Sequence, residues 1–312
     1  MLFTFYFRNM SRNFGVGQRD MTRAASVILN QSREKGGLSF SSVSTLLNRF
    51  DKFKAFAKEN GVARFERVTP ELVREYGLQL KNSDYSASYQ QNMLSAVNSV
   101  LTRAHEYGGR KWEPITGRNV GLQSRSFVRT ETTAQPTQVE AALTAMSPRA
   151  AAVAKLAYEL GLRSKEAALL NAHSALREAQ TKGSVSISDG TKGGRPRVIP
   201  LLNTRQLRAL EAAAQVQKDG KSLIPTGQNW NQFKNGELKD NRAVLHRHGI
   251  KGYHELRSAY AANRYFTLTR HQAPCNGGAI TNKHQDKKAR ECIAQELGHS
   301  RIDVITNYIG GR

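Results

Sequence analysis

Two segments of the sequence place cationic side chains where an anion could bind. Arg163 follows an apolar helical stretch and opens a new helix. An arginine at a helix N-terminus opposes the helix dipole, and a phosphate bound there would remove this conflict. His254 and Arg257 are three residues apart, so on a helix they share one face and point at one spot. Because arginine offers a planar fork for two oxygens, these segments predict a phosphate site.

Two further segments could supply a proton donor and a nucleophile. Lys192 lies in a glycine-rich turn between two predicted strands, from which it can reach into a groove and donate a proton. His299 belongs to the segment LGHSR, and Tyr308 follows nine residues later. A tyrosine hydroxyl has a free pKa of about 10, so it becomes a nucleophile only beside a site rich in positive charge. Each segment alone also fits an ordinary surface or packing role.

The charge of the chain points to a polyanionic partner. The 47 Lys and Arg residues exceed the 25 Asp and Glu residues, which gives a net charge of +22. Residues 1–134 hold 20 basic and 11 acidic side chains, a net +9, and residues 135–312 carry +13. Self-repulsion of this size costs stability unless a polyanion relieves it, and nucleic acid is the usual one. An anionic membrane surface, or a protein that is simply basic, are the alternatives on charge alone.

Composition excludes some classes of protein. Mean hydropathy is -0.55, and no apolar run approaches the roughly 20 residues of a membrane span. The opening MLFTFYFRNM has no basic region and no cleavage site, so we do not expect a signal peptide, and Met10 or Met21 are alternative starts. Two cysteines, Cys275 and Cys292, cannot build a disulfide scaffold, which favours a reducing, cytoplasmic location.

The elements that must position these residues fall into two groups. Residues 1–20 have no periodicity and are expected to form a flexible N-terminal arm. Residues 21–115 are expected to form a helical domain, and residues 116–135, rich in Gly, Ser, Thr and Arg, a linker. Within the helical domain, apolar residues recur every three or four positions. This spacing predicts helices over 21–32, 42–59, 70–80 and 86–107.

Residues 136–312 are expected to form a second, mostly helical domain with one small sheet. Strands are predicted at 184–188 and 196–201, because alternating residues flank a Gly-Gly turn. Helical patterns cover 148–160, 203–217, 227–247, 254–268 and 286–297, and a further helix begins at Pro136. The predicted fold class is mainly α with a small β-hairpin, an α+β second domain.

The order and spacing of four motifs resemble the tyrosine recombinase (phage integrase) family. The motifs are GLRSKEAALL, TKGGRPRVIPL, HELRSAYAANRYF and ELGHSRIDVITNYIG, within residues 136–312. Residues 21–115 are similar by pattern to the family's helical, SAM-like core-binding domain. The closest likeness is to integrases of bacterial mobile elements and prophages. The resemblance implies a two-domain clamp around double-stranded DNA, in the bacterial cytoplasm and at its nucleoid. It also implies a homo-tetramer on DNA, mostly a monomer in solution, with possible DNA-bending accessory proteins.

The resemblance assigns three residues to the scissile phosphate. In the family, two arginines clamp the non-bridging oxygens, and Arg163 and Arg257 match them. The histidine of LGH donates a further hydrogen bond, and His299 matches it. Such donors stabilise the extra negative charge of a pentacoordinate transition state more than they stabilise the ground state.

Three more residues match the family's proton-transfer groups and nucleophile. Lys192 matches the general acid that protonates the leaving 5′ oxygen, and His254 matches the histidine that assists proton transfer from the nucleophile. Tyr308 matches the nucleophile, which forms a 3′-phosphotyrosyl link. The resemblance implies no metal, no ATP and no cofactor. Lys182, which precedes the same hairpin, and Arg195 and Arg197, which follow its turn, make Lys192 the weakest of the matches.

Five basic residues are expected to contact DNA phosphates, although exposed helical Lys and Arg often only solvate a surface. They are Lys52, Lys54, Arg103, Arg110 and Arg195. The 42 residues from Arg257 to His299 exceed the family's usual spacing. The excess falls in residues 269–290, a basic insertion expected as a loop near DNA or as an ordered flap. The tail after Tyr308 is short, which leaves open how subunits would dock.

Other chemistries fit the sequence less well. The residues His271, Cys275, His284, Cys292 and His299 contain only one close pair, whereas structural zinc sites show two. Neither GxxxxGK[ST] nor GxGxxG occurs, which disfavours nucleotide hydrolysis. No isolated serine lies among convergent arginines, which disfavours a serine recombinase. The functions left are strand exchange of the integrase type, dimer resolution or topoisomerase-like relaxation, and a non-catalytic architectural role on DNA.

Overall fold

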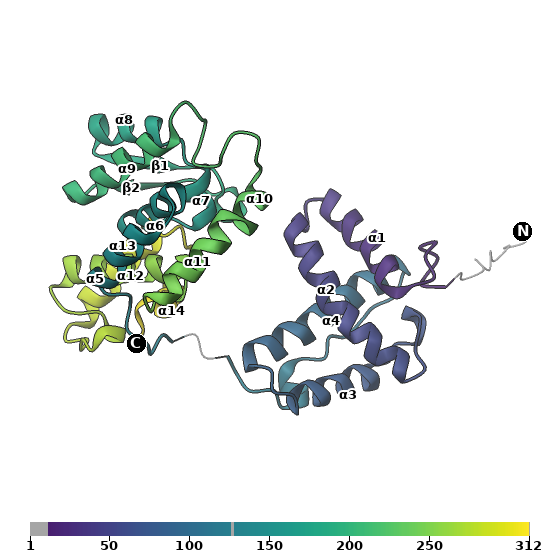
Figure 1. Ribbon diagram of the computed structural model, residues 1–312. Coiled ribbons are helices and arrows are strands. Elements are labelled where there is room, and N and C mark those ends of the chain that lie inside the picture. The colour runs from purple at the N-terminus through teal and green to yellow at the C-terminus, as the bar shows by residue number, and fades with distance from the viewer. Residues whose placement is uncertain (1–11, 126–127, 312) are drawn as a thin grey trace, which may run out of the picture. The chain divides into compact units, whose positions relative to one another are not determined.

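The chain divides into two units, residues 1–126 and 127–312 (Figure 1). The computed structural model describes residues 12–125 and 128–311. Each unit has a buried hydrophobic core of its own.

Over residues 12–125 the first unit contains four α-helices, and short polar side chains set where they begin. They are α1 (Met21–Glu34), α2 (Phe40–Glu59), α3 (Pro70–Lys81) and α4 (Ala87–Tyr107). Thr69 caps α3 by accepting from Leu72 N–H at 3.3 Å, ahead of Pro70 at the first helical position, as the sequence predicts. The cap of α2 is Ser39, so this helix begins earlier than predicted.

The ends of the first unit are more ordered than the sequence suggested. Residues 1–11 of the expected arm lie outside the described residues. Residues 12–20 are not a loose arm: Asn13 is fully buried and its Oδ1 accepts from Phe65 N–H at 3.0 Å. At the other end, Asn98 of α4 binds both N–H and C=O of Ile115, and the short helix η2 (Gly117–Val120) packs against α3. The part of the expected linker up to η2 therefore belongs to the first unit.

The second unit is helical around one hairpin, as predicted. Its helices up to the hairpin are α5 (Pro136–Ala145), α6 (Pro148–Leu160), α7 (Ser164–Leu169) and α8 (Ala172–Lys182). Strands β1 (Ser184–Ile187) and β2 (Arg197–Pro200) pair antiparallel, with Val185 opposite Ile199. The turn between them holds η3 (Lys192–Gly194). The helices that follow are α9 (Thr204–Gln217), α10 (Trp230–Asn235), α11 (Glu237–Arg247), α12 (Tyr253–Thr269), α13 (Lys283–Glu296) and α14 (Thr306–Ile309).

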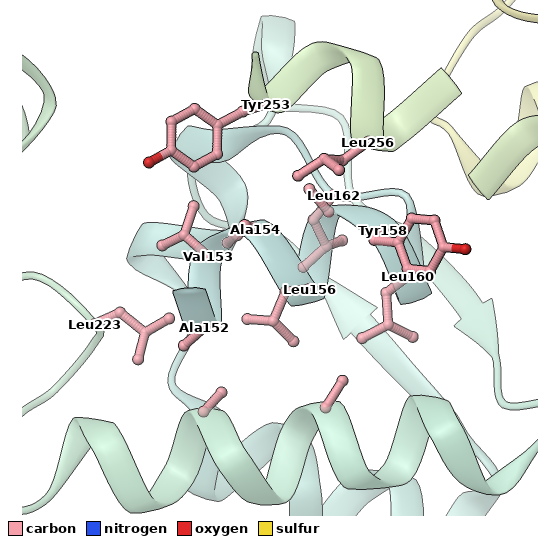
Figure 2. Packing of buried hydrophobic residues seen from close by; sticks show 14 of the residues in the cluster. Ala152, Val153, Ala154, Leu156, Tyr158, Leu160, Leu162, Leu223, Tyr253 and Leu256 are labelled. Atoms are coloured by element: carbon pink, nitrogen blue, oxygen red, sulfur yellow. The ribbon is translucent and has the colours of Figure 1, made fainter. Parts of the chain in front are cut away.

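Helix α6 runs through the core of this unit and fixes the two candidate arginines. Leu156 and Leu160 are fully buried, and α6 packs against both α9 and α12 (Figure 2). Leu162 and Leu256 belong to the same buried cluster. Because Leu162 precedes Arg163 and Leu256 precedes Arg257, core packing sets the backbone from which both arginines project.

The long segment between α12 and α14 is ordered and largely helical. The insertion at 269–290 was expected as a loop near DNA or a flap, but residues 283–290 form the start of α13. The short helix η4 (Pro274–Asn276) packs against α14, and Cys275 in it is only 6% exposed. A second short helix, η5 (Ile302–Ile305), leads directly into α14. The insertion therefore supports the helix that carries Tyr308.

Over residues 12–125 and 128–311, no helix is long and apolar enough to cross a membrane. Across the same ranges, no three His, Cys, Asp or Glu side chains gather as a metal site would need.

Candidate active site

Arg163 stands at the junction of α6 and α7, where glycine makes a sharp turn possible. Gly161 ends α6 with φ +63°, and a Cβ there would lie 2.5 Å from the ring of Tyr260. Only glycine fits a left-handed position packed this closely. Arg163 is the N-cap of α7, and its guanidinium donates to Glu166 Oε1 at 2.6 Å. Its side chain is 23% exposed, so it can still meet a ligand.

Arg257 is fully buried in the middle of α12, and protein atoms engage its donors. One terminal nitrogen donates to the carbonyl of Gly161 and the other to the carbonyl of Leu297. Its Nε donates to the hydroxyl of Tyr308 at 3.3 Å. Burial lowers the pKa of Arg257 to about 10, so the guanidinium stays charged at neutral pH.

Tyr308 lies on α14 with its hydroxyl held between Arg257 and His299. The hydroxyl is 3.0 Å from His299 Nε2, which is also 3.5 Å from Arg257 Nη2. Because a guanidinium only donates, Nε2 of His299 is an acceptor here, and the tyrosine hydroxyl donates to it. The phenol is thus bonded to an imidazole that can take its proton.

The second histidine flanks the phenol without a hydrogen bond to it. The ring of His254 is 5.2 Å from the ring of Tyr308, centroid to centroid. Burial lowers the pKa of His254, and the charge of Arg257 adds to this effect. Burial, with Arg257 and Arg163, lowers the pKa of His299 to about 4. Both imidazoles are therefore neutral near pH 7 and able to accept a proton.

The buried carboxylate of Glu166, which the sequence analysis did not predict, lies among three arginines. Glu166 binds Arg163 at 2.6 Å and Arg197 at 2.7 Å, and its Oε2 lies 3.8 Å from Arg257. Burial alone would raise the pKa of Glu166, but the bonds and charges of Arg197 and Arg163 lower it to about 2. The only sequence signal is that Glu166 lies three residues after Arg163, on the same helix face.

Arg197 has a structural place rather than an exposed one. It is the first residue of β2, is 9% exposed, and donates from Nε to the carbonyl of Glu296 at 2.7 Å. It thereby ties the hairpin to the end of α13, just before His299. Lys192 is exposed in η3, and within the described ranges no hydrogen bond or ion pair joins it to the other five candidates. The structure brings together Arg163, His254, Arg257, His299 and Tyr308.

The five residues expected to contact DNA differ in the partners that their side chains have within the protein. Lys54 pairs with Asp51 at 2.8 Å and Asp20 at 3.3 Å. The other four are placed as follows: Lys52 is 3.4 Å from the hydroxyl of Tyr85, Arg103 binds the carbonyl of Ser99 at 2.9 Å, Arg110 lies over the ring of Phe14, and Arg195 is exposed after η3.

Replacing Glu166 by glutamine is expected to destabilise the fold in a pH-dependent way. Removing one partner of a buried ionic cluster typically costs about 3 kcal/mol, because the remaining charges stay buried and unpaired. The pKa of Glu166 is lowered on folding, from 4.5 to about 2. Its contribution is therefore complete above the unfolded pKa and is lost as pH falls through the folded one. Urea unfolding of both proteins at neutral pH and at about pH 3 measures this difference.

The matched control for this prediction is Glu71→Gln. Glu71 pairs with Arg74 at 3.2 Å, but both side chains are exposed, so this change should alter the free energy of unfolding little. A Glu166→Gln protein as stable as the wild type at neutral pH would contradict the assigned role.

Comparisons with known proteins show which proteins the chain is similar to. Residues 121–263 match the family model described as Integrase, a range that includes Arg163, Lys192, His254 and Arg257. No curated relative matches the chain.

Solved structures match nearly the whole chain. The Tn1549 transposon integrase with transposon right end DNA is 14% identical, with a TM-score of 0.57, covering 92% of this chain and 95% of that one. The XerH recombinase in a post-cleavage complex with palindromic difH is 16% identical, with a TM-score of 0.57, covering 92% and 81%. A lambda integrase tetramer on a Holliday junction is 16% identical, with a TM-score of 0.56, covering 90% and 76%. At these identities the matches show a shared fold.

The family match covers the segments that carry both arginines and His254. Over residues 121–263 the chain is therefore similar to the integrase family, and it shares its fold with solved tyrosine recombinases.

Proposed function

We propose that this protein is an integrase that cleaves and rejoins DNA strands at specific sites through a covalent link to Tyr308. The single observation that carries the proposal is the bonding of the Tyr308 hydroxyl, which lies between Arg257 Nε and His299 Nε2. A phenol placed between a buried guanidinium and a neutral imidazole has both a proton acceptor and a cation beside the oxygen that must become nucleophilic.

The proposed reaction balances without metal or ATP. The oxygen of Tyr308 attacks the phosphorus of a phosphodiester and its proton passes to an imidazole. The bond from phosphorus to the 5′ oxygen breaks, and this oxygen takes a proton from a general acid. The product is a 3′-phosphotyrosyl bond and a free 5′ hydroxyl. Attack by the 5′ hydroxyl of another strand reverses these steps and restores the phosphodiester, so the bond energy is conserved.

Arg163 and Arg257 are the proposed ligands of the non-bridging oxygens. Arg257 is fully buried, and the phenol occupies its Nε. An incoming phosphate must therefore displace the Tyr308 hydroxyl from Arg257 before the two can react. His299 is the imidazole within hydrogen-bond reach of the phenol, and His254 flanks it, so either can receive the proton as the phenol shifts.

Double-stranded DNA is the proposed substrate, and both units are proposed to bind it. The net charge of +22 and its presence in both halves support this. We further propose a homo-tetramer on DNA and a monomer without it. The lambda integrase tetramer, a chain of the same fold, supports this assembly. The proposed task is integration or excision of a mobile element, assisted by DNA-bending accessory proteins.

Covalent trapping tests the function. The probe is a library of randomised DNA duplexes nicked in one strand, from which the short cleaved fragment diffuses away so that the adduct cannot reverse. The wild-type protein, without ATP and with a metal chelator, should form adducts that survive detergent. Sequencing the captured DNA should give a preferred site, which serves in all later assays. Salt-sensitive binding with no adduct would support an architectural role instead.

The assignment of Lys192 as general acid gives a chemical prediction. Lys192→Ala should lower cleavage by about 10² to 10⁴, because the 5′ oxygen leaves poorly without a proton. The same variant should cleave at nearly the wild-type rate when sulfur replaces this oxygen, because a thiolate leaves unprotonated. Single-turnover cleavage of both DNAs measures this.

Lys182 at the end of α8 is the matched control for Lys192. Its side chain is 69% exposed, and it lies before the same hairpin. Lys182→Ala should leave both rates unchanged. If Lys182→Ala instead slows cleavage of ordinary DNA, and the DNA with sulfur at the 5′ position restores the rate of this variant but not that of Lys192→Ala, the general acid is Lys182.

Free charge should decide which lysines and arginines bind phosphate. In a plot of the logarithm of the binding constant against the logarithm of salt concentration, Arg195→Ala should make the slope less steep by about 1. This is the change expected from the loss of one phosphate contact. Lys54→Ala should leave the slope unchanged, because two aspartates already neutralise this lysine. Titration of a DNA duplex of arbitrary sequence at several salt concentrations compares the two. Equal slope changes would contradict this distinction.

A further inference from the structure

The segment that enters the second unit is bonded directly to the helix that carries Tyr308. We call residues 129–133 the entry strap. The backbone N–H of Arg129 donates to the carbonyl of Thr306 at 2.9 Å. Thr306 is the first residue of α14, and its carbonyl also accepts from Gly310 N–H at 3.0 Å, across the one turn of this helix. A helix of four residues cannot hold its own shape, so it depends on such outside bonds.

The side chain of Arg129 ties the strap to the helix that carries His254. Its Nη2 donates to Glu255 Oε1 at 2.5 Å, and the two side chains are only 12% and 8% exposed. Its Nε donates to the carbonyl of Glu131 at 2.7 Å, and Nη2 also donates to the carbonyl of Thr132 at 2.8 Å. The guanidinium thus fixes the shape of the strap and attaches it beside His254.

The far end of the strap is fastened to the insertion. Thr133 N–H donates to Asn276 Oδ1 at 2.9 Å, and Asn276 Nδ2 donates to Thr133 Oγ1 at 3.0 Å. Asn276 belongs to η4, which packs against α14. The strap and the insertion therefore both contact the element that carries the nucleophile.

Gly310, two residues after Tyr308, leaves room for the strap because it has no side chain. Gly310 has φ +70° and ψ -172°, a conformation almost restricted to glycine. A Cβ on Gly310 would lie 2.3 Å from the carbonyl oxygen of Arg129. A larger residue would force the strap and the end of α14 apart.

We propose that Arg129 is a positioning residue for strand cleavage, which holds α14 and the start of α12 in the arrangement that Tyr308 and His254 need. The inference rests on the proposed function, because it concerns the same nucleophile. It assigns to the entry strap a part in catalysis, although none of its residues touches the phenol.

The main test compares Arg129→Ala with Glu131→Gln on the captured, nicked DNA at saturating protein. Arg129→Ala should lower the single-turnover cleavage rate about 10- to 100-fold, since misplacing reacting groups by about 1 Å costs about 10². DNA affinity should stay the same, and Arg129→Lys should recover part of the rate. Glu131→Gln should cleave at the wild-type rate, because Arg129 uses the backbone of Glu131, whose side chain pairs with exposed Lys251.

A pH profile distinguishes positioning from a general loss of structure. The charges that face His254 are Arg257, Arg163 and Arg129, which lower its pKa, and Glu255, which raises it. Without Arg129, Glu255 is unpaired and the pKa of His254 should rise. The acidic limb of the cleavage profile should then move to higher pH, and adding Glu255→Gln to Arg129→Ala should move it back.

Gly310→Ala supplies an independent arm. It should slow cleavage as Arg129→Ala does. If both residues act through the strap, the rate loss of the double variant should be smaller than the product of the two single rate losses. If Arg129→Ala fails to fold, Arg129→Gln is judged by the same criterion. Cleavage by a folded Arg129 variant at the wild-type rate with an unshifted profile would overturn the inference and leave the function intact. Absence of adduct with the wild type would instead overturn the proposed function.

Discussion

Replacing Tyr308 by phenylalanine should abolish the covalent adduct with DNA and leave DNA binding intact. The change removes one oxygen, the proposed nucleophile, and keeps the buried ring that packs within its cluster. Two hydrogen bonds are lost, to Arg257 and His299, at about 1 kcal/mol each. Gel analysis after detergent treatment measures the adduct, and a salt titration measures binding.

Tyr265→Phe is the matched control. Tyr265 is also buried, at 2% exposure, and its hydroxyl donates to Asp286 at 2.9 Å. This variant loses a comparable hydrogen bond, to Asp286 and not to Arg257 or His299, and should form adduct at the wild-type rate. Adduct formation by Tyr308→Phe would show that another residue is the nucleophile.

Replacing Arg257 by lysine should lower the rate of adduct formation by about 10² to 10³. Loss of one preorganised donor from a dry site costs about 3–4 kcal/mol of transition-state stabilisation. Lysine keeps the charge but has no planar fork, so it cannot span two phosphate oxygens and hold the phenol, the role proposed for Arg257. Single-turnover kinetics on the captured site measures the loss.

Arg264→Lys separates catalysis from stability. Arg264 lies on the same helix, is 9% exposed and pairs with Glu296 at 2.8 Å. Its replacement also perturbs a buried ion pair, but one without a bond to Tyr308, so the cleavage rate of the folded protein should be unchanged. Equal rate losses for both variants would mean that Arg257 acts through folding alone.

Local sequence signals determined much of the fold because their physics is local. The capping threonine and proline of α3, the glycine turn of the hairpin and the apolar spacing of α6 each act within a few residues. The predicted helix at 227–247 is in fact two, because the backbone breaks at Gly236 with φ -95° and ψ -107°. Periodicity continues across that break and does not reveal it.

The supports of the site were not predictable, because they join residues far apart in the chain. Glu166 meets Arg197 across 31 positions, and Arg129 meets Glu255 across 126. A charged residue usually lies at the surface, so nothing in the sequence indicates that Glu166, Arg197 and Glu255 are buried and that Arg129 is largely so. The motifs predict candidate residues for the site, and the long-range ion pairs around those residues required the structure.

Two segments that looked irregular turned out to be packed for a related reason. Asn13 and Asn276 each satisfy backbone groups with a side-chain amide, which gives order without helical or strand periodicity. Pattern methods detect repeated apolar spacing and do not detect single polar anchors. Sequence patterns therefore predict a flexible arm for the N-terminal residues and a loop or an ordered flap for the insertion.

Mapping the site of covalent attachment tests the account most directly. The adduct captured from the nicked duplex library is digested with nuclease and with trypsin, and the peptide that carries the nucleotide is identified by mass spectrometry. We expect the peptide that begins at Ile302, with the nucleotide joined through its 3′ phosphate to Tyr308. Attachment to any other residue, or through a 5′ phosphate, would contradict it.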